Sequence, residues 1–463
     1  MPLPREVTAE DAPESGRRSW GRRLDAIRWI GPGLVMAATA IGASHLVLAP
    51  TAGAAFGYAL LWVMAFSHLI KYPAFESGPR FAAATGTSLL DGYARVPGPR
   101  GWALAVFLLG TVVQGVTVLA GVLGVAAAVA YAALPAVPIA GWSLLLGLAI
   151  AALLATGGFD ALSALSKWML AGLTAMTVVA FVARPPGPDF VVGLVRPEIP
   201  PESVILLAAI LGWMPTGIDV AVWHSMWALE RREEWARRRP RSARVGDDVA
   251  ARAFATGRLD LWLGYGLSLV LSVLFLALGA EVLRPAGLVP QGSDVAITMA
   301  RLYTESLGAW VYPLFMVAAF FGMFSTAYGV LDGFPRAFAE TVVRLRDGRR
   351  RSARATPDTD DARRSAGAGP RATSIYWAFL FGSLALALVE TIWMPDPVAL
   401  VTVAAVVSFL LAPIFFVLNH YCVTRLIEDP GLRPGRAMRL WSWLGIAGVT
   451  GATAFFLWVQ FVR

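Results

Sequence analysis

Residues 212–219, with the sequence GWMPTGID, interrupt a hydrophobic segment that begins near Val204. Residues 41–45, IGASH, interrupt a second hydrophobic segment that begins with GPG at 31–33. An unpaired backbone group in lipid costs several kcal/mol, so irregular backbone at mid-depth survives only where it lines a cavity. Interrupted segments at matching places in two halves of a chain are typical of a transporter's substrate site.

The composition is that of a protein with many membrane spans. Of the 463 residues, 57% are hydrophobic and 15% are charged, whereas a soluble domain has about 25% charged residues. Apolar runs long enough to cross about 30 Å of hydrocarbon predict eleven spans. These spans are expected at 29–49, 57–75, 102–131, 138–156, 163–183, 203–228, 260–280, 308–331, 374–391, 396–420 and 438–461.

The two interrupted segments are the first and the sixth of these spans, as in a five-plus-five inverted repeat. We therefore predict an all-α integral membrane protein of two five-helix repeats and one extra helix. Its expected parts are a cytoplasmic segment at 1–28, the repeats at 29–183 and 203–420, cytoplasmic loops at 229–259 and 336–373, and helix eleven at 438–463. Because residues 1–28 have no apolar core, we expect no cleavable signal peptide.

Arginine gives the predicted sidedness. It is concentrated before the first span, in 231–258 and in 336–371, and is sparse in the segments that alternate with these. The positive-inside rule places the N-terminus in the cytoplasm and the C-terminus outside, in an inner or plasma membrane. Membrane sidedness and contact with anionic lipid therefore explain the net charge of +8, and nucleic-acid binding is not needed to explain it.

Several classes of function are excluded. One cysteine rules out disulfides within the chain and cysteine-based metal clusters, and four histidines rule out a His-rich metal tract. No phosphate loop, nucleotide motif or catalytic triad is present, so we expect neither an enzyme nor an ATPase, and no cofactor. Transport would be driven by gradients, with the lipid bilayer and the transported ion or solute as partners. We expect a monomer.

Several motifs occur at a recognisable spacing. Span one opens with Gly31-Pro32, span two opens with FGYALLW at 56–62, and ATGTSL follows at 84–89. Span six supplies Met214-Pro215 and then His224-Ser225. In these motifs the chain resembles the Nramp family of divalent-metal transporters, which share the LeuT-like fold and commonly have eleven spans.

The departures from the family pattern fall in the first break. Family members carry Asp-Pro-Gly-Asn there, and the Asp and the Asn bind the metal. Here Gly42 stands in place of the acid and His45 in place of the amide. The resemblance implies that the family's methionine ligand persists as Met214. About three extra residues separate Met-Pro from His-Ser in this chain, and they bring in Asp219.

His45, Met214 and Asp219 are the candidate metal ligands, with Thr216 between the last two. A neutral imidazole is the commonest metal ligand, a thioether favours transition metals, and Asp219 would restore the charge lost at the first break. Each residue also has a structural interpretation. The histidine could satisfy unwound backbone, the methionine could fill the core, and the aspartate could cap a helix or pair with an arginine.

The first break also admits an organic ligand. The backbone N–H groups of Gly42, Ala43 and Ser44 would begin a half-helix whose positive dipole end attracts a carboxylate, and Asp219 could pair with an amine. A carrier of a small organic solute such as an amino acid is therefore the alternative to a divalent-metal transporter. A transporter-like sensor that no longer moves substrate is a third possibility.

Further polar residues lie within or near the spans. His224 resembles the family histidine that has been linked to proton movement, and its ordinary pKa of about 6.5 suits that role; a packing histidine is the alternative. Most of Glu76, Gln114, Asp160 and Asp332 are expected to be caps or salt-bridge partners. We predict secondary transport of a divalent metal cation, with proton coupling as a further expectation.

Overall fold

The protein was analysed as a computed structural model, which describes residues 42–156, 159–238, 249–353 and 370–462. Every regular element within these ranges is a helix, so the predicted all-α class is confirmed for the part of the chain that is described. The predicted first half of span one, the N-terminal segment and parts of the two long cytoplasmic loops lie outside these ranges.

The helices follow one another along the chain in two halves. In the first half they are η1 (Ser44–Leu48), α3 (Ala49–Phe56), α4 (Leu61–Thr85), α5 (Leu89–Tyr93), α6 (Trp102–Ala133), α7 (Ile139–Thr156), α8 (Phe159–Ala183) and α9 (Asp189–Val195). In the second half they are η2 (Pro201–Ser203), α10 (Val204–Trp213), α11 (Val220–Arg238), α12 (Val249–Leu278), η3 (Gly279–Leu283), η4 (Gly292–Asp294), α13 (Val295–Leu307), η5 (Ala309–Val311), α14 (Tyr312–Ala353), α16 (Pro370–Trp393), α17 (Pro397–Arg425) and α18 (Arg436–Phe461).

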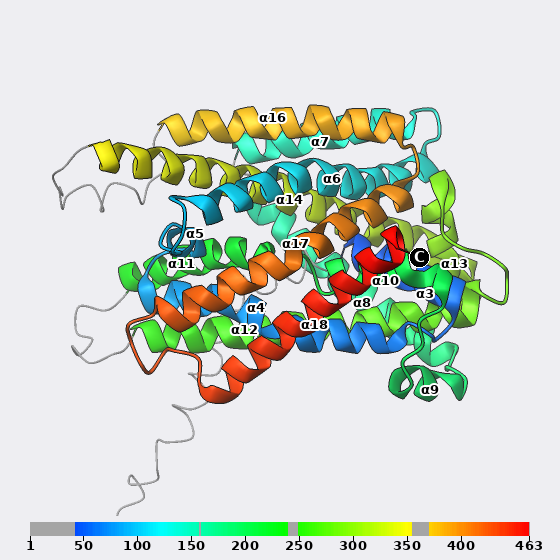
Figure 1. The fold of residues 1–463 in the computed structure, drawn as a ribbon. Coiled ribbons are helices and arrows are strands. Elements are labelled where there is room, and N and C mark those ends of the chain that lie inside the picture. The colour runs from blue at the N-terminus through cyan, green and yellow to red at the C-terminus, as the bar shows by residue number, and fades with distance from the viewer. Residues whose placement is uncertain (1–41, 157–158, 239–248, 354–369, 463) are drawn as a thin grey trace, which may run out of the picture.

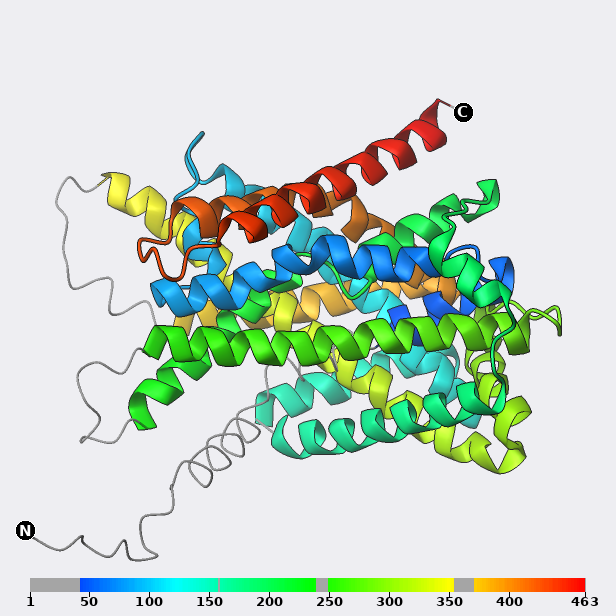
Figure 2. The same ribbon diagram turned by 90° about the horizontal axis from the view of Figure 1, so that it is seen from below.

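The long helices run side by side in one bundle, and α18 crosses its surface obliquely (Figures 1 and 2). Helix α6 packs against α14 and α17, while α4 packs against α11 and α12. Burial follows this arrangement, because residues 118–130 in the second half of α6 are all buried while α16 and α18 expose many apolar side chains. Exposed apolar surface on the outer helices is what a bilayer would cover.

Seven described helices are long and apolar enough to cross a membrane. They are Trp102–Ala133, Ile139–Thr156, Val249–Leu283, Ala309–Asp347, Thr373–Trp393, Pro397–Arg425 and Arg436–Phe461. Trp168–Ala183 and Pro201–Trp213 are shorter apolar helices. The remaining predicted spans are the first, which is only partly described, and the second.

The second span differs from its prediction in length and character. It was expected at 57–75, whereas α4 runs from Leu61 to Thr85 and is much less apolar than its neighbours. Its later turns carry a buried ion pair between Glu76 and Arg80, with Arg80 Nε 2.8 Å from Glu76 Oε2. Charges that satisfy one another let the helix continue past the point where its apolar run ends.

Four helices also extend into segments that were expected to be loops, and among them α12 begins at Val249 and α16 at Pro370. Helix α11 continues to Arg238 and α14 to Ala353. The extension of α14 is held by Arg344, whose side chain pairs with Glu340 on the same helix and with Asp91 of α5. Alanine and arginine have high helix propensity, so such a segment stays helical once its charges are paired.

Candidate functional site

The interruption of span six is present in the structure. Helix α10 ends at Trp213 and α11 begins at Val220, so residues 214–219 form no helix. The Met214–Pro215 peptide bond is cis. A proline has no N–H and cannot continue a helix, which accounts for the position of the break.

The segment after the first break is helical almost from its start. Gly42 lies in a bend, and its carbonyl accepts the backbone N–H of Leu46 at 2.9 Å. A π-helical turn, Ser44–Leu48, follows and leads directly into α3. Ala43, Ser44 and His45 thus belong to the helix rather than to unwound chain, and any unwinding of span one lies at Gly42 or earlier.

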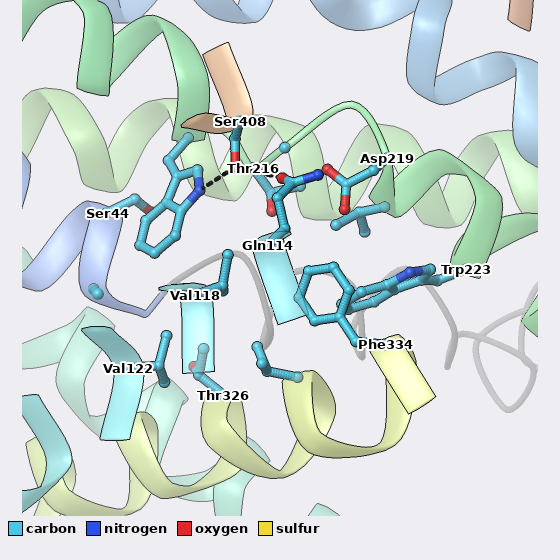
Figure 3. Close-up of a pocket in the computed structure, with 15 residues that line it drawn as sticks. Ser44, Gln114, Val118, Val122, Thr216, Asp219, Trp223, Thr326, Phe334 and Ser408 are labelled. Atoms are coloured by element: carbon cyan, nitrogen blue, oxygen red, sulfur yellow. Dashed lines mark hydrogen bonds between the residues drawn. The ribbon is translucent and has the colours of Figure 1, made fainter. Parts of the chain in front are cut away.

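A cavity of about 40 Å³ lies where the two interrupted spans meet (Figure 3). One buried water needs roughly 10–15 Å³ on this measure, so the cavity holds about three waters. Its wall is made by the start of the helix after the first break, by the break of span six with the adjoining ends of α10 and α11, and by α6, α14 and α17. The lining residues are Ala43, Ser44, Gln114, Val118, Val122, Trp213, Thr216, Gly217, Asp219, Val220, Trp223, Thr326, Val330, Phe334 and Ser408.

Asp219 is the only charged residue of this lining. Asp219 is 4% exposed, and it is the last residue of the break before α11 begins. A methyl group added at Gly217 would lie 2.4 Å from Asp219 Oδ1. Glycine at that position therefore gives the carboxylate the room that it occupies.

A short hydrogen-bonded chain crosses one side of the cavity (Figure 3). The indole N–H of Trp213 donates to Ser408 Oγ at 3.0 Å, and that hydroxyl donates to Gln114 Oε1 at 2.6 Å. Gln114 Nε2 and the indole nitrogen of Trp223 have no hydrogen-bond partner among the described residues. Buried donors normally have partners, so these two would be satisfied by water or by cargo.

His45 does not line the cavity. Its imidazole is fully buried, with Nε2 2.9 Å from Ser268 Oγ and 3.0 Å from the Ser268 carbonyl oxygen on α12. His68 of α4 reaches the same hydroxyl, with its Nε2 at 2.9 Å. His45 thus joins the first interrupted span to α12, and its role as a metal ligand stays a prediction.

The other predicted site residues occupy varied places. Ala43, Ser44, Thr216 and Asp219 line the cavity, whereas Gly42, Met214 and His224 do not. A methyl group added at Gly42 would lie 2.6 Å from the hydroxyl of Thr326 on α14.

Met214 and His224 are both fully buried. The Met214 carbonyl accepts the hydroxyl of Ser67 at 2.6 Å. Neither ring nitrogen of His224 has a hydrogen-bond partner among the described residues. The described part of the chain contains no group of three or more His, Cys, Asp or Glu side chains suited to hold a metal ion.

Of the other polar residues, Glu76 and Asp332 are ion-pair partners, of Arg80 and Arg336 respectively. The side chain of Asp160 lies outside the described part. Gln114, in contrast, lines the cavity.

The sequence analysis missed Lys71, which is fully buried in α4 against the broken span. An ionisable residue in the middle of a predicted span is itself a functional signal.

The family model for natural resistance-associated macrophage protein-like proteins, Nramp, matches residues 33–459. The chain belongs to the Nramp family. The resemblance found in the sequence motifs is therefore confirmed over nearly the whole chain. Nramp proteins are membrane transporters and not enzymes, so this chain is an integral membrane transporter.

Three relatives have similar sequences. An uncharacterized protein of Pasteurella multocida is 27% identical over 454 residues, which cover 95% of this Nramp chain and 93% of that protein. The divalent metal cation transporter MntH of Chromohalobacter salexigens is 28% identical over 322 residues, covering 67% and 70%. MntH of Bacillus subtilis is 25% identical over 340 residues, covering 71% and 74%.

Two solved structures show the fold. A mutant of the manganese transporter of Eremococcus coleocola matches with a TM-score of 0.64 and 14% identity, covering 99% of this chain and 93% of that one. The nucleobase-cation-symport-1 family transporter Mhp1, closed with bromovinylhydantoin bound, matches with a TM-score of 0.54 and 14% identity, covering 93% and 91%. At this identity the likeness establishes the LeuT-like fold of the Nramp chain and nothing about cargo.

Proposed function

We propose that this Nramp protein is a secondary transporter that carries a divalent metal cation through the cavity between its two interrupted spans. The observation that supports this most directly is the Asp219 carboxylate, the one charged side chain among the described residues that faces a space of about three waters. A small cation with part of its water shell fits such a space, and the acid would neutralise part of its charge. Two MntH relatives carry the name of divalent metal cation transporters.

The donor set gives an expectation about the metal. The oxygen-bearing side chains around the cavity are the Asp219 carboxylate, the amide of Gln114 and the hydroxyls of Ser44, Thr216, Thr326 and Ser408. Carboxylate, carbonyl and water ligands suit Mg²⁺, Ca²⁺ and Mn²⁺. Participation of His45 and Met214 would add softer ligands and favour Mn²⁺, Fe²⁺ or Co²⁺ over Ca²⁺.

Metal binding to the wild-type protein tests this proposal first. Because the cavity has one acid and room for a partly hydrated ion, we expect saturable heat and a rise in melting temperature with Mn²⁺. Isothermal calorimetry and thermal unfolding in nanodiscs, with Mn²⁺, Mg²⁺, Ca²⁺ and Co²⁺ in parallel, measure both effects. No heat and no stabilisation at millimolar Mn²⁺ would rule out the metal and leave the organic solute.

A small organic solute is the second candidate, and one observation favours it. The two unpartnered donors, Gln114 Nε2 and Trp223 Nε1, belong to residues that line the same cavity as the Asp219 carboxylate. A cargo with both an acceptor and a cationic donor would satisfy all three groups. The cavity would have to widen for it, because a space of about three waters is smaller than an amino acid. A mixed amino-acid panel in proteoliposome uptake distinguishes the two candidates.

We further propose eleven spans, with repeats at 29–183 and 203–420, helix eleven at 438–463, the N-terminus in the cytoplasm and the C-terminus outside. Contacts at one end of the bundle support the alternation of segments between the two sides. The Tyr58 hydroxyl donates to Glu281 Oε1 at 2.6 Å, and the Gly187 N–H donates to the same oxygen at 3.2 Å. All three residues belong to segments that the proposed topology places outside.

The opposite end of the bundle is consistent with the same topology. Arg344 Nε donates to Asp91 Oδ1 at 2.9 Å, which joins two segments assigned to the cytoplasm. Burial alone would raise the pKa of the Asp91 carboxyl, but hydrogen bonds from Arg344 and Ser88 outweigh it and hold that pKa below its ordinary value. Arg80 likewise donates to the Leu432 carbonyl at 2.6 Å, again between cytoplasmic segments.

Reporter fusions test the topology. A reporter inserted at residue 360 should be cytoplasmic, and one fused after Arg463 should lie outside, because an odd number of spans separates the N-terminus from the C-terminus. Alkaline phosphatase and a fluorescent protein that folds only in the cytoplasm give complementary signals. Two reporters on the same side would mean that a span has been miscounted.

We also propose that His224 takes part in proton coupling. Its fully buried ring has no described hydrogen-bond partner, although buried polar groups normally have one. The helices packed against α11 are α4, α12, α5 and α14, and each carries ionisable groups. They include His68, Lys71, Tyr72, Glu76 and Arg80 on α4, Asp260 and Tyr265 on α12, Asp91 and Tyr93 on α5, and Tyr328, Asp332 and Arg336 on α14. A proton held or released in this region would alter the charge balance of the bundle near the cavity.

His224→Ala should abolish the stimulation of uptake by external acid while leaving cargo binding largely intact. Transport assayed at pH 5.5 and 7.5 against calorimetric affinity separates the two effects. His420→Ala is a suitable control, because His420 contacts Ser442 of α18 at the edge of the bundle. Unchanged pH dependence in His224→Ala would assign the residue to packing.

We expect the protein to act as a monomer, which mass photometry in nanodiscs would measure.

A further inference from the structure

Lys71 places a positive charge on the interrupted sixth span. The side chain is fully buried in the middle of α4. Its Nζ lies 3.0 Å from the carbonyl oxygens of Leu211 and Gly212, 2.8 Å from that of Met214 and 2.9 Å from that of Thr216. One ammonium thus contacts four backbone carbonyls of a single short segment.

These carbonyls are available because α10 stops inside the bundle. The last four carbonyls of an α-helix have no partner within it, and they carry the partial negative charge of the helix end. The Met214 N–H bonds to the Ile210 carbonyl, while the carbonyls beyond it turn toward α4. Without a positive partner, these oxygens would form an unsatisfied and electronegative pocket in a region remote from water.

The arrangement resembles the coordination of a monovalent cation more than a set of directed hydrogen bonds. A lysine ammonium has three N–H donors, whereas four oxygens lie within 3.0 Å of its nitrogen. Rings of backbone carbonyls bind monovalent cations in channels. Unwound carbonyls and half-helix ends coordinate coupling cations in transporters with interrupted spans.

We propose that Lys71 is a tethered cation that occupies a monovalent-cation site at the break of span six, so that the protein keeps this site filled without Na⁺ or K⁺. The lysine stands where a free coupling ion would otherwise bind. Transport would then not require Na⁺ or K⁺ at this position, whatever the cargo. The inference rests on the carbonyl contacts and holds independently of whether a divalent metal is carried.

If Lys71 were only a structural cap of the end of α10, the expected result would differ. A cap needs only hydrogen-bond donors in fixed directions, and a free inorganic ion, which has no N–H, could not replace it. A cation site, in contrast, should accept other small cations once the tether is removed. Methylammonium is the closest free analogue of the lost group, and choline is too large to enter.

The experiment measures the melting temperature of Lys71→Ala in nanodiscs, in chloride salts of choline, Na⁺, K⁺ and methylammonium at constant ionic strength. The wild type should give the same value in all four salts. The variant should melt lower in choline and show a saturable rise of about 3 °C or more with methylammonium and with Na⁺ or K⁺. Buffers contain no divalent metal, so failure here is independent of the Mn²⁺ test.

Ser67→Ala is the matched control. Ser67 lies one turn before Lys71 on α4 and donates to the same Met214 carbonyl, but it carries no charge. Its removal should lower the melting temperature equally in every salt. Lys71→Gln, which keeps two amide donors, is measured in the same series in case Lys71→Ala cannot be recovered in choline.

Three outcomes would overturn the proposal. The first is a melting temperature of Lys71→Ala or Lys71→Gln that is identical in all four salts. The second is stabilisation of the wild type by Na⁺ or K⁺ as large as that of the variants, because the site would then not be filled by the lysine. The third is failure to recover either variant in any of the salts, because no free cation could then stand in for the tether.

Discussion

Asp219→Asn should abolish saturable Mn²⁺ uptake in proteoliposomes. The substitution preserves the shape of the side chain but removes the only charge that the described residues place at the cavity. A partly dehydrated divalent ion would then meet neutral oxygens alone, and a buried charge without a counter-charge is strongly unfavourable. We expect a loss of at least 100-fold in uptake efficiency, about 2.7 kcal/mol. Initial rates over a range of Mn²⁺ concentrations measure it.

Gly217→Ala provides a graded companion to this test. It keeps the carboxylate but forces it to move, because the new methyl group would lie 2.4 Å from Asp219 Oδ1. Binding should weaken while some transport remains. Asp294→Asn, at an exposed position in η4, controls for the substitution itself. Wild-type Mn²⁺ uptake by Asp219→Asn would exclude the carboxylate from the metal path.

Gly212→Ala should largely prevent the protein from folding. The added methyl group would lie 2.0 Å from the Ala405 carbonyl oxygen of α17 and 3.1 Å from Phe409 Cβ. The first contact is with backbone, so relief requires α10 and α17 to separate. Overpacking of a well-packed core typically costs about 1–3 kcal/mol, and a forced backbone separation adds to this cost. Yield of monodisperse protein and melting temperature in detergent measure the effect.

Gly266→Ala is the matched control, because a methyl group there meets no atom within 4 Å. The same change in the interior of α12 should be neutral or stabilising by up to about 1 kcal/mol, since alanine favours the helix. Equal yields and equal melting temperatures for the two variants would mean that α10 and α17 are less tightly packed than the structure indicates.

The features that could be predicted from sequence are those with local causes. The break at 214–219 follows from a proline and two glycines in an apolar run, and backbone chemistry alone fixes it. The all-α class follows from the length of the apolar segments. Asp219 was a candidate ligand with a helix cap or an arginine partner as its alternative, and it lines the cavity as part of the break itself.

The features that could not be predicted depend on contacts between distant segments. Sequence spacing does not reveal that Lys71 meets carbonyls some 140 residues later, or that Gln114 and Ser408 meet across the cavity. It also does not give the direction of a side chain at the start of a half-helix. Ser44 lines the cavity, whereas its neighbour His45 contacts α12.

The hydroxyl of Ser268 joins three segments at one point. His45, from the first interrupted span, and His68, from α4, both lie 2.9 Å from it, and Ser268 itself belongs to α12. None of these segments can slide past the others without separating a buried polar contact in which all three take part. The contact therefore couples the three segments mechanically, and any displacement of this part of the bundle moves them together.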